Sequence, residues 1–214
     1  MPSLLPVSAP PTPATTTPVQ PEHTPTGSLA PRYFEQLYAA HGDPWSFASS
    51  PYEAGKYAAT LAELPRVRYR SGLEIGCAIG VLTARLSGCC DRLLAVDVSE
   101  AALRQARARC AGLPVRFQRR TLPDEMPAGP FDLVVLSEVG YYWSEADLEA
   151  ARARIAAAAA PGAHLVLVHY TGPTNYPLTG DAVHEAFRSD PAWATTTTRR
   201  EANYRLDVLE RVGG

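Results

Sequence analysis

Glu74, Gly76 and Gly80 are the residues whose types and spacing point most directly to chemistry. They close a short apolar segment that starts at Leu73, and a pattern typical of a helix start follows them. Glycine is needed where a backbone turns sharply or comes close to a ligand. A strand, a glycine-rich turn and a helix start form a nucleotide cradle at the edge of a parallel sheet. We therefore expect Gly76 and Gly80 to lie close to a bound cofactor.

A second acid, Asp97, ends the next apolar run, Leu93–Asp97. In folds that bind adenosine-type cofactors, an acid about 20 residues beyond the glycines grips the ribose hydroxyls. A carboxylate suits this task because it accepts hydrogen bonds on both oxygens. A purely structural interpretation stays open for each feature. Asp97 could serve only to cap the following helix, and the two glycines could serve only to allow close packing at an ordinary turn.

The glycine spacing indicates which cofactor fits. A dinucleotide site reads G-x-G-x-x-G, because a pyrophosphate must lie against the helix N-terminus. Here Ala78 replaces the middle glycine, and Glu74 would repel a pyrophosphate but suit an amino group. S-adenosylmethionine carries a sulfonium, an α-amino group and a ribose diol without any phosphate, so the sequence favours this cofactor. The alternatives are an NAD-dependent oxidoreductase and a non-catalytic cofactor-binding protein.

Composition divides the chain of 214 residues into two unequal parts. Residues 1–30 are mostly Pro, Thr, Ser and Ala, and we expect a disordered leader there because such a segment has little to bury. This leader lacks the apolar stretch of a secretory signal. Residues 31–214 suffice for one domain with a sizeable core.

The net charge and the spacing of the cysteines limit which binding partners and which cellular compartment we expect. The net charge of −2 argues against a nucleic-acid partner. Four cysteines without C-x-x-C spacing are typical of free thiols in a reducing cytoplasm. No run of the sequence is long and apolar enough for a membrane span, and no carboxylate and histidine cluster has metal-ligand spacing. We expect a cytoplasmic protein that binds neither membrane nor metal, and the oligomeric state stays open.

Strand-like apolar runs alternate with helix-like patterns, which is typical of a doubly wound α/β sheet. Phe131–Leu136 has the composition of a central parallel strand. The segments Trp193–Thr198 and Tyr204–Leu209 predict an antiparallel C-terminal hairpin. Ser99 is expected to cap a helix, and Pro161-Gly162 are expected to end one. Helices are predicted at 33–40, 51–64, 81–87, 101–110, 145–160 and 179–187, and further strands at 72–75, 93–97, 115–117 and 163–169.

A family resemblance runs the length of the predicted domain, on Tyr33–Tyr38, Asp43–Phe47, Ser50–Glu53, Lys56–Leu61, Leu73–Gly80, Phe131–Glu138, Tyr141-Tyr142 and Tyr176–Asp181. On these residues the chain resembles a class I S-adenosylmethionine-dependent methyltransferase and, more narrowly, is similar to the nodulation protein S group. The resemblance implies a Rossmann-like methyltransferase sheet, with the N-terminal helices as a lid over S-adenosylmethionine. The group's name-giving member methylates the amino group of a chitooligosaccharide-type sugar.

The resemblance also implies where the rest of the cofactor lies, because parallel α/β sheets bind ligands at the carboxyl ends of their strands. Val98, next to the ribose-gripping acid, is expected to contact the cofactor. Methyltransferases of this fold often carry an acid after the third strand, whereas residues 118–122 contain none. Backbone groups around Thr121 and Leu122 are expected to hold the adenine instead. Trp45 from the lid would stack on the sulfonium or the adenine, with core packing as the alternative.

The fourth and fifth strands end in groups that we expect beside the methyl acceptor. Ser137 is expected to contact the cofactor, and Glu138, Tyr142 and His169 are the catalytic candidates. The Glu138 carboxylate would take a proton from the acceptor or orient it by a hydrogen bond, unless it is a structural acid. His169 would face the site as a base near neutral pH, with a structural role as its alternative.

The expected activity is transfer of a methyl group to nitrogen or oxygen of a small molecule, such as an amino sugar, an oligosaccharide or a secondary metabolite. A sulfonium is already activated, so the protein has mainly to bring the reactants together, align them and exclude water. A base is needed only when the acceptor arrives protonated. The residues after the fourth strand, Ser-Glu-Val-Gly, differ from the Asn/Asp-Pro-Pro-Tyr of enzymes that methylate nucleobases or proteins, which argues against those substrates.

Overall fold

The computed structural model describes residues 20–21 and 24–213. Most of the expected leader, residues 1–19 and 22–23, therefore lies outside the described residues. In chain order the elements are α1 (Pro31–His41), α2 (Pro51–Ala62), β1 (Gly72–Ile75), α3 (Val81–Leu86), the short 3-10 helix η1 (Ser87–Cys89), β2 (Leu93–Asp97), α4 (Glu100–Arg109), β3 (Val115–Arg119), β4 (Phe131–Ser137), the 3-10 helix η2 (Gly140–Tyr142), α5 (Glu145–Ala158), β5 (Ala159–Tyr170), α6 (Gly180–Arg188), β6 (Trp193–Arg200) and β7 (Tyr204–Arg211).

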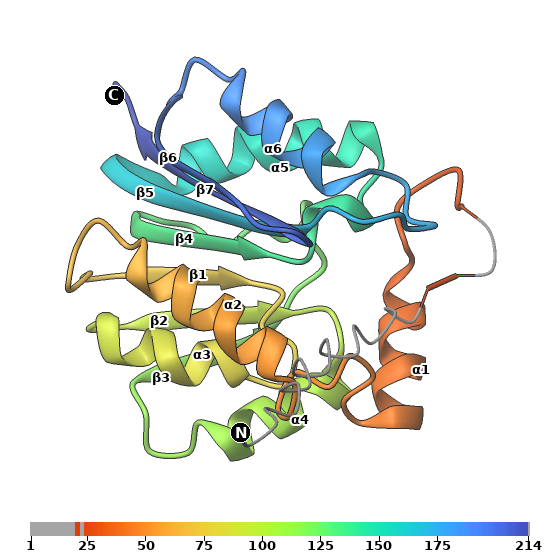
Figure 1. The fold of residues 1–214 in the computed structure, drawn as a ribbon. Coiled ribbons are helices and arrows are strands. Elements are labelled where there is room, and N and C mark those ends of the chain that lie inside the picture. Colours follow the sequence, from red (N-terminus) through yellow and green to blue (C-terminus); the bar gives the residue numbers. More distant parts are fainter. Residues whose placement is uncertain (1–19, 22–23, 214) are drawn as a thin grey trace, which may run out of the picture.

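The strands form one seven-stranded sheet in the order β3-β2-β1-β4-β5-β7-β6. Strands β1 to β5 pair in parallel, and β7 pairs antiparallel with both β5 and β6. Helices α5 and α6 cover one face of the sheet, and α2 and α3 cover the other (Figure 1). The predicted doubly wound α/β sheet, mostly parallel with an antiparallel C-terminal hairpin, is confirmed.

The chain changes direction within the sheet between β1 and β4. From β1 it moves outward to β2 and β3, then returns to place β4 on the other side of β1. Connections on the two sides of this point diverge, which leaves a crevice at the carboxyl ends of the strands. The fold therefore provides a ligand site between the loops that follow β1, β2 and β4.

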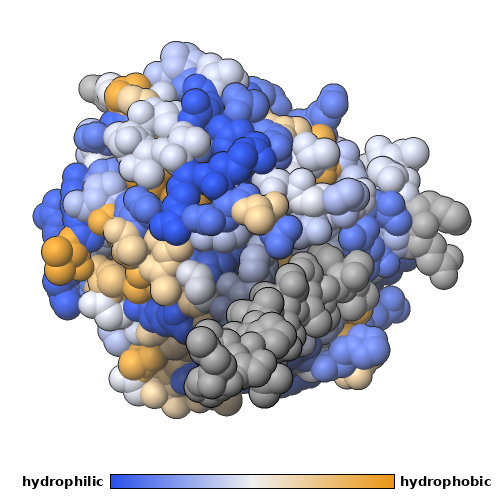
Figure 2. Space-filling model, in the orientation of Figure 1, coloured by the Kyte–Doolittle hydropathy of each residue, from blue (hydrophilic) through white to orange (hydrophobic). Residues whose placement is uncertain are grey.

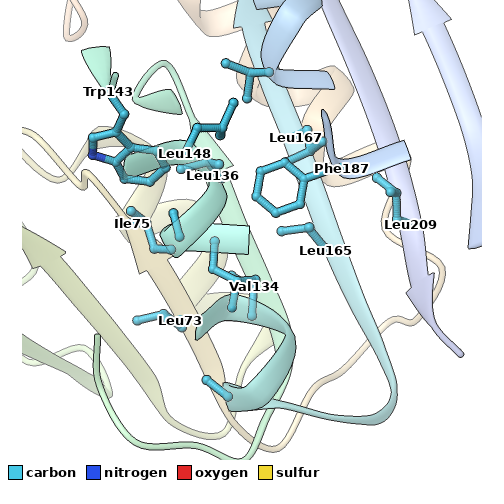
Figure 3. Packing of buried hydrophobic residues seen from close by; sticks show 14 of the residues in the cluster. Leu73, Ile75, Val134, Leu136, Trp143, Leu148, Leu165, Leu167, Phe187 and Leu209 are labelled. Atoms are coloured by element: carbon cyan, nitrogen blue, oxygen red, sulfur yellow. The ribbon is translucent and has the colours of Figure 1, made fainter. Parts of the chain in front are cut away.

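The core on the α5 and α6 side consists of apolar side chains from the central strands. Leu73, Val134, Leu165 and Phe187 are fully buried there (Figure 3). Leu73 lies opposite Val134 in the parallel register of β1 and β4, so the two side chains fall on the same face. This packing fixes where each strand ends and hence where the loops beyond it begin.

Several helices begin at a side chain that accepts a hydrogen bond from the first turn, which satisfies a backbone N–H that has no partner within the helix. The predicted cap Ser99 is confirmed, since its hydroxyl accepts from the N–H of Ala102. The other residues that cap in this way are Ser50, Ser144 and Thr179.

The predicted end of the long helix at 145–160 was wrong by two residues. Helix α5 ends at Ala158, and β5 starts at once at Ala159 with Pro161 inside it. Phe131 pairs with Ala159 but Leu133 pairs with His164, so the start of β5 bulges away from β4. A proline is tolerated at such an irregular strand start because the ladder does not need its missing N–H.

Hydrophobic residues on the face shown in Figure 2 are scattered among hydrophilic ones. Of the described residues, the large apolar side chains that stay exposed are Val67, Leu113 and Val212. Single exposed apolar residues of this kind are normal on protein surfaces. In the part of the chain that the structure describes, none of the helices has the length and apolar character needed to span a membrane.

Gly80, at the start of α3, should be essential for stability. Its φ is +81°, and an added Cβ would lie 2.9 Å from the backbone Cα of Ala106 in α4. We expect Gly80→Ala to lower the free energy of unfolding by about 2 kcal/mol, measured by urea denaturation. Gly88→Ala is the control, because its Cβ would meet nothing within 4 Å. Equal stability of the two variants would contradict this account.

Candidate active site

A pocket of about 300 Å³ lies at the carboxyl edge of the sheet, at the switch point between β1 and β4. Ten of the twelve residues predicted for the site line it, whereas Gly80 and His169 do not. The ten are Trp45, Glu74, Gly76, Asp97, Val98, Thr121, Leu122, Ser137, Glu138 and Tyr142. Parallel strands therefore bring together residues that the sequence spaces over almost a hundred positions.

Glu74 is a buried carboxyl group without a complete set of partners. It is 2% exposed, and its Oε2 atom has no hydrogen-bond partner among the described residues. Burial raises the pKa of Glu74 to about 7, because desolvation disfavours the charged form, and the Asp97 charge adds to the rise. An unsatisfied carboxylate at the pocket wall suits a ligand that brings a positive charge, such as an amino group.

Asp97 is held by the backbone on both of its oxygens. Oδ2 accepts from the N–H of Ala78 and Oδ1 from the N–H of Ser99, each at 2.9 Å. Burial raises the pKa of Asp97 to about 6, although these backbone bonds lower it in part. Each oxygen keeps a second lone pair, so the carboxylate can still accept a ribose diol while it orders the turn.

The two glycines of the motif serve different contacts. At Gly76, where φ is +76°, an added Cβ would lie 2.1 Å from a methyl of Val139, so glycine lets the loop after β4 pack on the turn after β1. Gly80 packs against α4, as described above, and does not line the pocket. The next residues along the chain, Val81 and Leu82 of α3, do line the pocket, and the expected contact of Gly80 with the cofactor stays a prediction.

Glu138 is the centre of a buried ionic cluster beside the pocket. Its Oε1 accepts from Lys56 Nζ at 2.6 Å, and Lys56 also binds Glu53 Oε1 at 2.9 Å. Its Oε2 accepts from the hydroxyl of Tyr141 and, at 3.0 Å, from the N–H of Tyr170. The side chain of Lys56 is only 3% exposed and that of Glu138 14%. The cluster ties helix α2 to the loop after β4.

Electrostatics keep Lys56 charged within this cluster. Burial alone would lower the pKa of Lys56, but the carboxylates of Glu138 and Glu53 outweigh burial and raise it. Burial raises the pKa of Glu53, and its Oε2 has no partner among the described residues. Lys56 lies within a segment of the family resemblance, but sequence reasoning missed its place beside the site. The signal that could have found it is that Lys56 is the only lysine of the chain.

The expectation that His169 faces the site was wrong. Its side chain is fully buried behind the loop after β4. Its Nε2 accepts from the N–H of Gly140 at 3.1 Å, and its Nδ1 lies 3.2 Å from Nε2 of His184. Burial lowers the pKa of His169 well below its usual value, with smaller contributions from His184 and Lys56. Sequence order along β5 placed His169 near the edge but could not show the direction of its side chain.

The N-terminal part of the domain covers the pocket. Phe34 and Tyr38 of α1 line it together with Trp45, in agreement with helices that act as a lid. The end of the expected leader also packs here, because Ser28 bonds to Asp147 and its hydroxyl accepts from the N–H of Ser144 at 2.7 Å. Ser28 thus contacts helix α5 at the pocket, and the domain boundary at residue 31 stays a prediction.

Comparison with known proteins places this pocket in a family. The family model described as Nodulation protein S (NodS) matches residues 34–169. The chain belongs to the Nodulation protein S family. Nodulation protein S of Rhizobium tropici is 32% identical over 134 residues, which cover 59% of this chain and 55% of the relative. An uncharacterized methyltransferase of Mycobacterium tuberculosis is 33% identical over 103 residues, which cover 48% of this chain and 51% of the relative. The chain thus spans about half the length of the curated relatives it matches.

Solved structures of family members and related proteins match over more of the fold. The N-methyltransferase NodS from Bradyrhizobium japonicum WM9 in complex with S-adenosyl-L-homocysteine has a TM-score of 0.75 and 25% identity, covering 84% of this chain and 97% of that one. A putative methyltransferase from Pseudomonas syringae has a TM-score of 0.67 and 38% identity, covering 75% and 99%. The matched region is an S-adenosylmethionine-dependent methyltransferase domain with S-adenosylmethionine as its cofactor. The dinucleotide alternative is not favoured.

We expect the Glu74 carboxylate to lower the stability of the folded protein and to strengthen binding of the cofactor. Its pKa of about 7 lies above the ordinary value of 4.5, so the folded state keeps the proton longer and loses stability as pH rises between these values. We expect Glu74→Gln to raise the free energy of unfolding at pH 8 by up to about 3 kcal/mol, and to change little at pH 4. The same variant should bind S-adenosylmethionine more weakly at pH 8, because the ammonium loses its carboxylate.

Urea denaturation at both pH values and calorimetric titration measure the two effects. Glu149→Gln on the exposed side of α5 is the matched control and should change neither quantity, since the Glu149 side chain is 70% exposed. A Glu74→Gln variant that is no more stable at pH 8 than the wild type would refute the proposed cost of this buried charge.

Proposed function

We propose that this protein transfers a methyl group from S-adenosylmethionine to a nitrogen, or an oxygen, of a small molecule, and that an amino sugar or amino-bearing oligosaccharide is the first class to test. The observation that carries the proposal is Glu138. A carboxylate has about four acceptor positions. Lys56, Tyr141 and the N–H of Tyr170 occupy three of them, which leaves one on Oε1 among the described contacts.

Pocket residues match the parts of the cofactor by their chemistry. Glu74 would hold the α-amino group and Asp97 the ribose diol, because one offers an unpaired buried oxygen and the other offers spare lone pairs. The segment that carries Thr121 and Leu122 would contact the adenine, and Trp45 would cover the site from the lid. When bound, S-adenosylmethionine supplies an activated methyl group, which passes to the acceptor's lone pair while the sulfur keeps the bonding electrons.

Glu138 would orient the acceptor. Three donors contact its oxygens, so the carboxylate is held in one place beside the pocket. Its remaining position suits an N–H or O–H of the acceptor, which would direct the lone pair of that atom toward the methyl group. A neutral amine then needs no base before transfer, and it releases one proton to solvent afterwards.

Titration calorimetry with S-adenosylmethionine and with NAD tests the cofactor. We expect binding of S-adenosylmethionine with a dissociation constant in the micromolar range, typical of enzyme substrates, and no heat with NAD. We expect this difference because the pocket is homologous to that of S-adenosylmethionine-dependent methyltransferases, and because its turn lacks the middle glycine of a dinucleotide site. Absence of binding to S-adenosylmethionine, with a folded protein by circular dichroism, would reject the proposed function.

A coupled assay of S-adenosylhomocysteine formation tests the acceptor. The probes are glucosamine and chitooligosaccharides with a free terminal amino group, and the fully N-acetylated oligosaccharides are the matched controls. An N-methyltransferase should turn over the free amines and leave the acetamides unmodified, because an amide nitrogen has no available lone pair. Turnover of both series alike would point to hydroxyl groups as the methyl acceptors.

Once an acceptor is found, Glu138→Gln tests the role that we assign to this residue. We expect kcat to fall at least about 100-fold, as for other residues that align reacting atoms. Asp124→Asn, which changes an exposed carboxylate at the pocket rim, is the control and should stay within about twofold of wild type. If Glu138→Gln retains near-normal kcat, the assigned role of this residue is wrong.

A further inference from the structure

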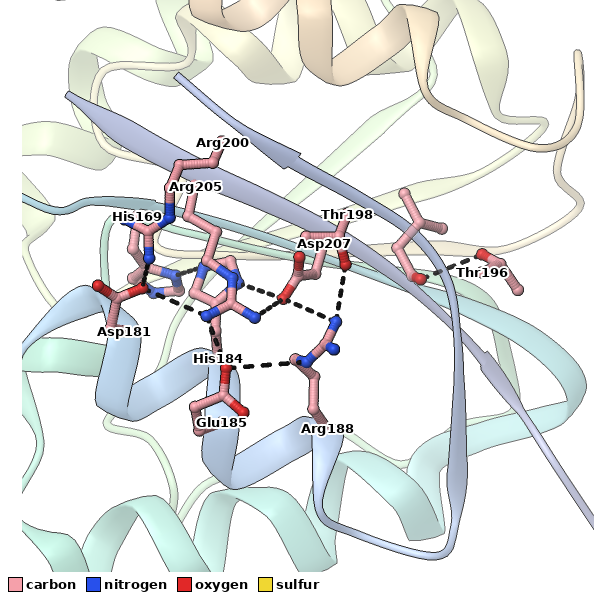
Figure 4. A network of polar contacts seen from close by, with 11 residues as sticks. His169, Asp181, His184, Glu185, Arg188, Thr196, Thr198, Arg200, Arg205 and Asp207 are labelled. Carbon is pink, nitrogen blue, oxygen red and sulfur yellow. Dashed lines mark hydrogen bonds and ion pairs between the residues drawn. The ribbon is translucent and has the colours of Figure 1, made fainter. Parts of the chain in front are cut away.

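A chain of buried polar groups runs behind the site from the loop after β4 to strand β7. Gly140 N–H donates to His169 Nε2 at 3.1 Å, His169 Nδ1 lies 3.2 Å from His184 Nε2, and His184 Nδ1 lies 2.9 Å from Asp207 Oδ2 (Figure 4). The three side chains are fully buried, and they come from β5, α6 and β7. None of them lines the cofactor pocket.

The backbone fixes the direction of every hydrogen bond in this chain. An amide N–H can only donate, so His169 Nε2 must carry a lone pair and its proton must sit on Nδ1. That proton points at His184 Nε2, which must therefore accept, and the proton of His184 must sit on Nδ1 and point at Asp207. Protonation of either ring would put two donors face to face. Burial lowers the pKa of both histidines, which keeps them neutral.

A carboxylate is required at the far end, and the surrounding charges provide it. Burial would raise the pKa of Asp207, but its bonds to His184 and Arg205 outweigh burial and lower it. Arg205 Nη2 lies 2.9 Å from Asp207 Oδ2, and its Nη1 lies 2.7 Å from Glu185. Arg188 approaches the same Oδ2 at 3.7 Å. Figure 4 shows these side chains grouped between α6 and the hairpin.

The near end of the chain holds a loop that does not relax freely. Glu138 has a φ of +58°, a left-handed conformation that is costly for a residue with a side chain. An added Cβ at Gly140 would lie 2.5 Å from Val183, so the loop packs directly on α6. The same loop carries Tyr141, whose ring meets that of His169 edge-on at 5.3 Å, and Tyr142, which lines the pocket.

We propose that His169, His184 and Asp207 form a tautomer-locked positioning relay that holds the loop 138–142 in the shape that binds the cofactor. The inference rests on the proposed function, because it assigns this loop to the S-adenosylmethionine pocket. The three residues act through Gly140 and touch neither cofactor nor acceptor. They are positioning residues, and the role of base expected for His169 is replaced by the role of hydrogen-bond acceptor for a backbone amide.

Two substitutions of His169 distinguish the role of its Nε2 atom from that of its Nδ1 atom. In His169→Gln the side-chain carbonyl reaches the position of Nε2 and can still accept from Gly140. In His169→Asn the shorter amide reaches only the position of Nδ1, so the Gly140 N–H is left buried without an acceptor. An unsatisfied buried donor is costly, so we expect the dissociation constant of S-adenosylhomocysteine to rise about tenfold in His169→Asn and less than about threefold in His169→Gln.

His164→Gln is the matched control. His164 lies five residues before His169 in the middle of β5, is also buried, and pairs through Nδ1 with the Tyr69 hydroxyl at 2.9 Å. It should lose stability in urea denaturation without any change in S-adenosylhomocysteine affinity. A loss of affinity in His164→Gln as large as in His169→Asn would mean that the effect is general destabilisation. Wild-type affinity in a folded His169→Asn would equally overturn the relay.

A second measurement does not depend on ligand binding. Long-range ¹H–¹⁵N correlation spectra of the full chain with ¹⁵N-labelled histidine report the tautomer of each ring, with assignments from His169→Gln and His184→Gln. We expect His169 and His184 to be neutral with the proton on Nδ1 throughout pH 6–8. A proton on Nε2 of either ring, or a charged ring, would overturn the relay. If the wild type binds no S-adenosylhomocysteine but shows these tautomers, the proposed function fails, and the relay keeps only its structural part, the locked hydrogen-bond chain from Gly140 to Asp207.

Discussion

Strand β1 is paired along its whole length with β2 on one side and β4 on the other, in parallel on both. Parallel pairing makes neighbouring strands end at one edge, and the reversal of strand order at β1 opens a crevice there. Four residues meet because of this one constraint: Glu74 in β1, Gly76 just after it, Asp97 at the end of β2 and Glu138 just after β4. A shift of register by one residue would turn the buried faces of these strands over and separate the group.

Ionisable side chains gather at the carboxyl edge of the sheet, where they are buried and their desolvation costs free energy. Glu74 and Asp97 both have raised pKa values because desolvation outweighs the lowering effect of the Thr83 side chain in the first case and of hydrogen bonds from backbone N–H groups in the second. Lys56 is buried between two carboxylates, an arrangement whose attraction has to offset a large desolvation cost. The apolar core on the α5 and α6 side provides the stability that such a site consumes. The buried carboxyl groups at this edge therefore oppose folding, whereas the apolar packing away from the pocket favours it.

The candidate site could be predicted where the signal is local. A glycine-rich turn after an apolar run marks Gly76, and an acid that closes the next run marks Asp97, because strand ends are readable from hydropathy. The contact of Lys56 beside the pocket and that of Ser28 in its wall could not be predicted. Each makes its decisive contact with a residue more than 80 positions away, Lys56 with Glu138 and Ser28 with Asp147. Periodicity along the chain carries no information about such contacts.

Sequence by itself determined the order of strands and helices, the cofactor turn and the family, since each depends on neighbouring residues and their spacing. Tertiary structure decided which side chains of the sheet edge face the pocket. Glu138 follows β4 and His169 lies near the end of β5, yet Glu138 lines the pocket and His169 lies behind it. The ring of His169 is bonded to Gly140 on one side and to His184 of α6 on the other, and Asp207 of β7 bonds His184 in turn. The direction of a side chain at a strand end is set by what packs against it, and those partners come from distant parts of the chain.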